Sequence, residues 1–141
     1  MSSSQLSKAE IKELVGTLRA FPRFAEMGNA DLETLAKTAT LSTVPASWPL
    51  INADTPADSC YVILDGEVEV VVDHKPVAQL GAGSVVGEVG LFESRLRNAT
   101  VVSKTRVKVL HLVAEVFRDL VSAHPAIGAA LQGPTLADTA G

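Results

Sequence analysis

The sequence contains one cysteine, few aromatic residues, no excess of positive charge and no long apolar run, and each shortage excludes a class of protein. Cys60 cannot form an intrachain disulfide, and the start of the chain lacks the basic and apolar regions of a secretory signal, so we expect a reducing, cytoplasmic location. The 12 Lys and Arg residues stand against 16 Asp and Glu, and this formal charge of −4 argues against electrostatic binding to nucleic acid or anionic membranes. No apolar run approaches the roughly 20 residues that span a bilayer, so no membrane span is predicted.

Length and composition predict one domain with its own core. A folded chain of 141 residues buries roughly 70% of the surface that its unfolded form exposes, and 47% of the residues are hydrophobic. Such a core needs no metal ion or disulfide to stabilise it, so we expect the chain to fold by itself.

Two amphipathic helices are predicted at the start of the chain. Ser7 followed by Glu10 is a capping box, and the apolar residues after it fall on one helical face until Phe21-Pro22 ends the run. A second helix is expected to begin after Asn29, an N-cap type of residue, and to reach about Ala39.

From Thr40 onward the hydrophobic period changes to two and β-branched residues cluster in short runs, which is typical of strands. Asp65-Gly66 between two such runs predicts a two-residue hairpin, because Gly takes the positive φ that the tight turn needs. Asp73-His74-Lys75 predicts another turn. The expected strands lie near residues 41–45, 49–52, 60–64, 67–73, 76–80, 98–103 and 106–113.

Helices are predicted again after the last strand, over residues 114–123 and, after Pro125, over residues 126–132. Gly133-Pro134 ends the second of them, and the tail that follows is expected to be mobile. The predicted fold class is mainly β with flanking helices, an antiparallel jelly roll. Its expected parts are an N-terminal helical segment (1–40), a β region (41–113), C-terminal helices (114–132) and a flexible tail (133–141).

The segment over residues 85–101 interrupts the strand pattern. A strand with two glycines breaks into a turn too short for a full helix, and such a segment exposes backbone N–H groups that favour an anion. Gly90 lets a ligand approach the main chain closely because it has no Cβ. Glu88 supplies a carboxylate that accepts hydrogen bonds from sugar hydroxyls, and Arg97 supplies a permanent forked cation that suits phosphate oxygens. The predicted ligand is therefore a phosphorylated sugar.

These residues resemble the cyclic-nucleotide-binding domains of catabolite activator proteins, protein kinase A regulatory subunits and cyclic-nucleotide-gated channels. Gly87-Glu88, then Leu91, then Arg97-Asn98-Ala99-Thr100-Val101 look like the phosphate-binding cassette of that family, which would occupy residues 86–101 here. Upstream, Pro56-Ala57-Asp58 leading into residues 61–70 is similar to the family's central hairpin.

The resemblance covers roughly residues 24–123 and implies a fold, a double-stranded β-helix, or β-roll, with a short phosphate-binding helix. It also implies that Glu88 accepts from the ribose 2′-OH, that Arg97 pairs with the exocyclic oxygens of the cyclic phosphate, and that backbone N–H groups near Gly90, Leu91 and Ala99 complete the anion site. The implied ligand-binding residues are Gly87, Glu88, Val89, Gly90, Leu91, Arg97, Asn98 and Ala99.

The ligand implied in this way is cyclic AMP, with cyclic GMP as the alternative, because the asparagine that follows Arg97 can both donate and accept and does not decide the base. In the family the nucleotide is unchanged, so the resemblance implies a sensor domain, not an enzyme, that needs no cofactor. The expected partner is a downstream effector protein or domain that responds to a conformational change.

The sequence departs from the family at three places. Ser47 and Asp54 stand where family members commonly have glycine, and Asp tolerates the left-handed region better than most residues. The helix predicted over residues 126–132 is short where many relatives carry a long one, so the lid over the base is short, absent or supplied by a partner. No helix-turn-helix module follows the β region, so direct DNA binding is not predicted.

The alternative function is a nucleotide-free β-roll that serves as a protein-interaction scaffold. The missing lid and the lack of an effector domain in this sequence favour this alternative, and the intact pair of Glu88 and Arg97 opposes it. We find no arrangement of nucleophile and base that would indicate an enzyme. Alternating basic residues near the last strand are expected to form its solvated face, namely Lys104, Arg106 and Lys108. No metal site is predicted, because no second His or carboxylate stands at ligand spacing from any of His74, His111 and His124.

Overall fold

The first helix forms where the capping box predicts it. In the computed structural model, which describes residues 6–93, 97 and 99–132, helix α1 spans Lys8–Arg19. The Ser7 hydroxyl accepts a hydrogen bond from the Glu10 N–H at 3.1 Å, and the Ser7 N–H donates to the Glu10 carboxylate at 2.8 Å. These two bonds satisfy amides that the start of a helix leaves without partners, so α1 begins sharply at this point.

The second helix, α2 (Asn29–Thr38), starts one residue earlier than predicted, and its N-cap residue is Gly28 instead of Asn29. The Asn29 side chain accepts a hydrogen bond from the Arg19 guanidinium, so it ties α2 to α1 and makes no capping bond of its own. Between the two helices the chain forms a short 3-10 helix, η1 (Pro22–Phe24), and buries Phe24 completely.

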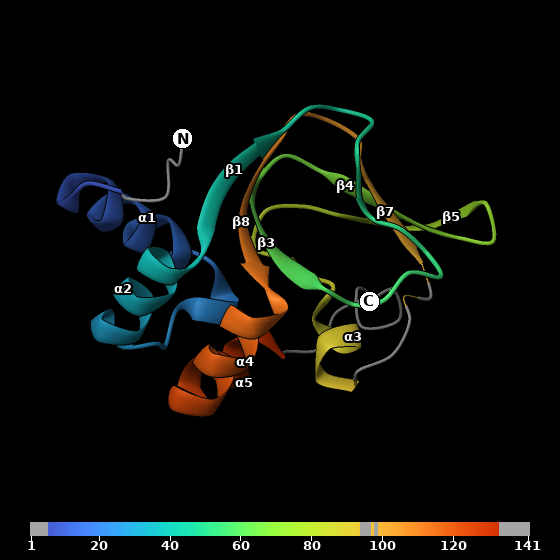
Figure 1. Cartoon of the computed structure of the whole chain (residues 1–141). Coiled ribbons are helices and arrows are strands. Elements are labelled where there is room, and N and C mark those ends of the chain that lie inside the picture. Colours follow the sequence, from blue (N-terminus) through green and yellow to red (C-terminus); the bar gives the residue numbers. More distant parts are fainter. Residues whose placement is uncertain (1–5, 94–96, 98, 133–141) are drawn as a thin grey trace.

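The described residues form eight strands in two antiparallel sheets of four, which confirms the jelly-roll prediction (Figure 1). The strands are β1 (Thr40–Val44), β2 (Pro49–Ile51), β3 (Ser59–Asp65), β4 (Val68–Val72), β5 (Lys75–Leu80), β6 (Val85–Val86), β7 (Thr100–Ser103) and β8 (Val107–Val113). The helix-side sheet has the order β1-β8-β3-β6, and the outer sheet has the order β2-β7-β4-β5. The inner faces of the two sheets pack together as one aliphatic cluster, the interior of the roll.

Strand β3 separates this interior from the helices. Successive strand residues point to opposite faces of a sheet. Cys60 and Val62 accordingly belong to the cluster under the helices, whereas Tyr61 and Ile63 belong to the interior of the roll. Cys60 is completely buried.

The predicted hairpin at Asp65-Gly66 is wrong. Strand β3 pairs with β6 and β8, whereas β4 pairs with β5 and β7, so the chain crosses between the sheets at Gly66. A Cβ at Gly66, whose φ is +93°, would meet the Arg106 carbonyl oxygen and the Val107 side chain, so the crossing requires glycine because of this close approach.

The second predicted turn is a true hairpin between β4 and β5. Asp73 and His74 have φ values of 51° and 66°, and positive φ at both central residues is what a type I′ turn requires. Ser47 and Asp54, which stand where glycine was expected, also take positive φ, at 62° and 66°. The Ser47 N–H donates to the Ser103 carbonyl at 2.7 Å, and this bond helps to hold the left-handed turn.

Two helices follow β8, α4 (Ala114–Ala123) and α5 (Pro125–Leu131), close to their predicted ranges. The Arg23 guanidinium donates to the Ala130 carbonyl at 2.9 Å and so joins η1 to the end of α5. The tail over residues 133–141, predicted to be mobile, lies outside the described residues. Among the helices of the described residues, none has the length and apolar character needed to cross a membrane.

Candidate functional site

The candidate site begins at Gly87, between strand β6 and the short helix α3 (Glu88–Glu93), which lies at one end of the roll (Figure 1). Gly87 has a φ of +90°, and a Cβ added there would lie 3.0 Å from Ile51 Cδ1, 3.0 Å from the Ser59 carbonyl oxygen and 3.1 Å from Arg97 Nη1. The absence of a side chain at Gly87 is therefore what allows the Arg97 guanidinium to lie against the main chain.

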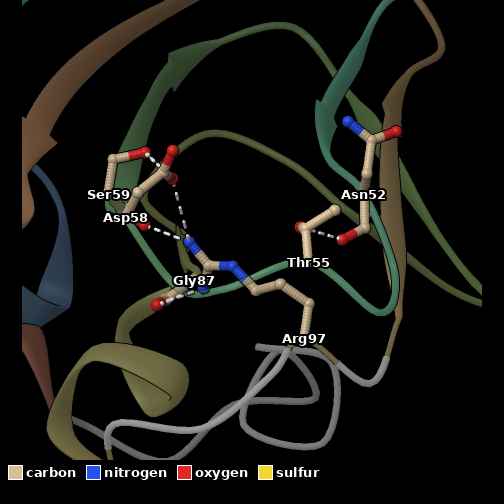
Figure 2. Close-up of polar contacts among 6 residues, drawn as sticks. All are labelled: Asn52, Thr55, Asp58, Ser59, Gly87 and Arg97. Carbon is tan, nitrogen blue, oxygen red and sulfur yellow. Dashed lines mark hydrogen bonds and ion pairs between the residues drawn. The ribbon is translucent and has the colours of Figure 1, made fainter.

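Arg97 is held in place by both its main chain and its side chain. Its N–H donates to the Thr55 carbonyl at 2.8 Å, and its own carbonyl accepts from the Asp54 N–H at 2.9 Å. The guanidinium points into the site (Figure 2), where Nη1 donates to the Gly87 carbonyl at 2.7 Å and Nη2 donates to the Ser59 carbonyl. Only 3% of the residue is exposed, so the cation is fixed before any ligand arrives.

A carboxylate that the sequence analysis did not select lies beside this cation. Asp58 Oδ1 is 4.0 Å from Arg97 Nη2, and the Asp58 side chain is 88% exposed (Figure 2). Burial lowers the pKa of Arg97, and the negative charge of Asp58 opposes that shift. Arginine nevertheless remains a permanent cation in proteins, so the site carries a fixed positive charge.

Glu88 is the first residue of α3 and is 1% exposed, with both carboxylate oxygens shielded from solvent. Burial raises the pKa of the Cys60 thiol, and the negative charge of Glu88 raises it further. Cys60 therefore stays protonated and is a poor nucleophile. What the site offers chemically is a buried carboxylate together with a fixed guanidinium, a pair suited to hold a hydroxyl and an anion.

The structure brings Gly87, Glu88 and Arg97 together, as the cassette motif predicts. Gly90 and Leu91 are buried within α3, and Ala99 is completely buried just before β7. Val89 belongs to α3, and Asn98 lies outside the described residues.

Sequence reasoning missed Asp58 and Ser59 as members of the site. Ser59 lies 38 residues before Arg97 in the chain, and only the packing of β3 against β6 and α3 brings its carbonyl to the guanidinium. A main-chain acceptor leaves no signal in the residue type, so no pattern would have identified Ser59. For Asp58 the signal was present, because an acidic residue ends the motif Pro56-Ala57-Asp58.

The other charged residues considered in the sequence lie apart from this site. Lys104, Arg106 and Lys108 are exposed, but only Lys108 lies on a strand, β8. Lys104 and Arg106 belong to the turn between β7 and β8, so the predicted strand face is wrong for these two. His111 stacks on Tyr61 inside the roll. Within the described ranges no group of three or more His, Cys, Asp or Glu side chains is placed to hold a metal ion.

Comparison with known proteins gives the family. The model of the cyclic nucleotide-binding domain matches residues 42–124. The chain is 32% identical over 115 residues to the uncharacterized NTE family protein Rv2565 of Mycobacterium tuberculosis, covering 81% of this chain and 20% of that protein. It is also 32% identical over 117 residues to a cyclic nucleotide-gated potassium channel of Rhizobium etli, covering 83% of this chain and 33% of the channel.

Among solved structures, the one described as "Sp-2Cl-cAMPS bound to PKAR CBD2" superposes on this chain with a TM-score of 0.76 at 18% sequence identity. The match covers 84% of this chain and 82% of that one. This likeness shows that the two share a fold. The chain spans between 20% and 33% of the length of the two curated relatives named above. On the match of the family model and the arrangement of the described residues, the chain belongs to the cyclic nucleotide-binding domain family.

Proposed function

We propose that this domain binds a 3′,5′-cyclic purine nucleotide, with cyclic AMP as the expected ligand and cyclic GMP as the alternative. The observation that carries the proposal is the burial of Glu88 and Arg97 on either side of Gly87, with 1% and 3% of their surfaces exposed. Charged side chains are almost never buried this far unless they are paired, because removing them from water is costly, and such buried charges cluster at functional sites.

The charges of the site fit a cyclic nucleotide. A cyclic phosphodiester carries one negative charge at neutral pH, and Arg97 is a cation whose forked N–H groups suit phosphate oxygens. Glu88 would accept a hydrogen bond from the ribose 2′-OH, since an ionised carboxylate is an acceptor only. We propose that the nucleotide is bound without being turned over, and the raised pKa of Cys60, which makes its thiol a poor nucleophile, supports this part of the proposal.

We further propose that ligand binding is relayed through α4 and α5 to an effector protein or domain. Helix α3 and helix α4 both pack on β3, and α5 packs on α2 and η1, so a shift of α3 has a contiguous path to the C-terminal helices. Polar contacts also join the N-terminal helices to that end of the chain. The Arg23 guanidinium donates to the Ala130 and Leu131 carbonyls, and Asp31 Oδ1 lies 3.3 Å from His124 Nδ1. A relative named as a gated channel supports a role beside an effector.

Titration calorimetry with cyclic AMP, cyclic GMP and 5′-AMP tests the binding proposal. Arg97→Ala is expected to weaken cyclic AMP binding by about 10- to 150-fold, because one charge-assisted hydrogen bond contributes about 1.5–3 kcal/mol. Arg97→Lys keeps the charge but loses the fork, and it should fall between wild type and the alanine variant.

The matched control is Arg106→Ala, which removes an exposed arginine of the β7–β8 turn and should leave the affinity unchanged. Each variant is first checked for cooperative unfolding, because Arg97 also holds the main chain at Gly87 and Ser59. Absence of binding heat and of any thermal shift with millimolar cyclic AMP or cyclic GMP would contradict the proposal and favour the scaffold function.

A further inference from the structure

Helices α1 and α2 enclose a groove that is separate from the candidate nucleotide site. The two helices pack side by side, and Figure 1 shows them apart from α3. The groove between them, the α1–α2 groove, has a volume of about 680 Å³, which is in the size range of binding sites in proteins. Its described lining residues all lie between Leu6 and Lys37, so it belongs to the N-terminal helices alone.

The floor of the α1–α2 groove is apolar and is lined by Leu6, Ile11 and Val15. Ile11 and Val15 belong to the core under the helices, and at 8% and 9% they are the two most exposed members of that buried cluster. The core therefore reaches solvent along this groove. An occupant with apolar side chains would cover this surface, and its removal from water is favourable.

The rim of the groove is positively charged. Lys8 and Lys12 line it from α1, and Lys37 lines it from α2 together with one acid, Glu33, which lies 3.8 Å from Lys37. Neither the Lys8 nor the Lys12 ammonium group makes an ion pair or a hydrogen bond to another described residue. Three lysines against one glutamate give the groove a charge of +2, although the formal charge of the whole chain is −4.

The groove has the length and the spacing to receive a helix. Lys8, Ile11, Lys12 and Val15 all line it, and they follow the i, i+3, i+4, i+7 spacing of one helical face. At 1.5 Å per residue this row extends about 10 Å, or two helical turns. An amphipathic helix fills such a groove with its apolar face and places its anchors at the same spacing.

We propose that the α1–α2 groove docks an acidic amphipathic helix of a partner protein. Apolar side chains of that helix cover Ile11 and Val15, and its carboxylates lie beside Lys8 and Lys12, where opposite charges steer association. Charge and shape select this occupant, because the net negative charge of the chain repels nucleic acid and a flat bilayer surface does not reach the floor of a groove. The docking does not depend on a nucleotide, since the groove shares no residue with the proposed nucleotide site.

Fluorescence polarisation with three labelled peptides of roughly 14 residues, or four helical turns, tests the proposal. The acidic peptide carries a leucine stripe at i, i+3, i+4 and i+7 with glutamates on both flanks, and the wild-type chain should bind it saturably without nucleotide. A basic peptide has lysine in place of each glutamate, and a polar peptide has serine in place of each leucine. Both should bind at least about 10-fold more weakly, because each lacks one of the two complementary features.

A double variant, Lys8→Glu with Lys12→Glu, reverses the charge of the rim. Lys8 is the first residue of α1, where the helix dipole favours an acid, and Lys12 is exposed, so the helix should still form. The variant should bind the acidic peptide at least about 4-fold more weakly than wild type and should prefer the basic peptide. The matched control is Lys75→Glu with Lys104→Glu, which changes the net charge equally at exposed positions outside the groove. It should keep the wild-type affinity, because charges beyond about 8 Å are screened at physiological salt.

Three results would overturn the docking site. The first is no saturable binding of the acidic peptide by the wild type at millimolar concentration. The second is equal affinity of the acidic and polar peptides, or of wild type and the rim variant, because binding would then not need the floor or the lysines. The third is an equal loss in the control, because net charge alone would then attract the peptide. Should the rim variant not fold, Lys12→Ala decides the outcome, with an expected loss of about 1.5- to 5-fold.

Discussion

Replacing Gly87 by alanine should destabilise the domain and weaken its ligand site at the same time. The backbone at Gly87 has a φ of +90°, and an added Cβ would lie within 3.0–3.1 Å of Ile51, the Ser59 carbonyl and the Arg97 guanidinium. A residue that carries a Cβ is strained by about 1–3 kcal/mol at such a φ, and overpacking adds about 1–3 kcal/mol. We therefore expect Gly87→Ala to lower the free energy of unfolding by at least about 2 kcal/mol. Relief of the contact requires the guanidinium to move, which disturbs the anion site.

Denaturant unfolding followed by circular dichroism measures the first effect, and calorimetric titration with cyclic AMP measures the second. Gly16→Ala is the matched control, because a Cβ there meets nothing within 4 Å and Gly16 lies inside α1. This control should raise the free energy of unfolding by about 0.5–1 kcal/mol, since alanine is the better helix former. A Gly87→Ala variant that is as stable as wild type would refute the reasoning, because neither the strain nor the close packing would then exist.

Three further changes test other parts of the structure. Asp58→Asn removes an exposed carboxylate that lies 4.0 Å from Arg97 and would compete with a bound phosphate for this cation. The affinity for cyclic AMP, measured by calorimetry, should therefore rise by up to about 5-fold. A weaker complex would contradict this role of Asp58. Because burial lowers the pKa of His111 below 6.5, the unfolded state takes up the proton first, and stability should fall as the pH drops from about 6.5 through the lower folded pKa. Between pH 7.5 and pH 5.5, the free energy of unfolding measured by denaturation should fall less in His111→Phe than in wild type. An equal fall would mean that groups other than His111 cause the pH effect. Ser7→Ala removes the cap of α1 and should cost about 0.5–2 kcal/mol of stability in the same assay, whereas no change would mean that the capping box contributes nothing.

The elements set by local chemistry were predictable from the sequence. The capping box placed the start of α1, and Asp73-His74-Lys75 gave the β4–β5 hairpin, because both signals act within a few residues. Asp65-Gly66 shows the limit of such signals. The same glycine permits a tight turn and a crossing between sheets, and which of them forms depends on strands far along the chain.

The charged half of the site was also predictable, since Glu88 and Arg97 stand in one short motif with Gly87. Its main-chain half was not, because the Ser59 carbonyl reaches Arg97 across 38 residues through strand pairing. The motif therefore identified the charged side chains of the proposed site, and the fold supplied the main-chain acceptors that hold the cation in place.

The stacked pair of Tyr61 and His111 was not predictable from the sequence, and the reason lies in strand β3. Its central residues, from Cys60 to Leu64, are all apolar or aromatic and nearly all buried, since one face packs on the helices and the other fills the roll. A continuous apolar run carries no alternation, so the sequence does not say which face Tyr61 takes. A slip of one residue would turn Tyr61 toward the helices and Cys60 into the roll. The register with β8 alone sets Tyr61 opposite His111, so a substitution that shifts this register should remove the polar pair from the roll even if every strand still forms.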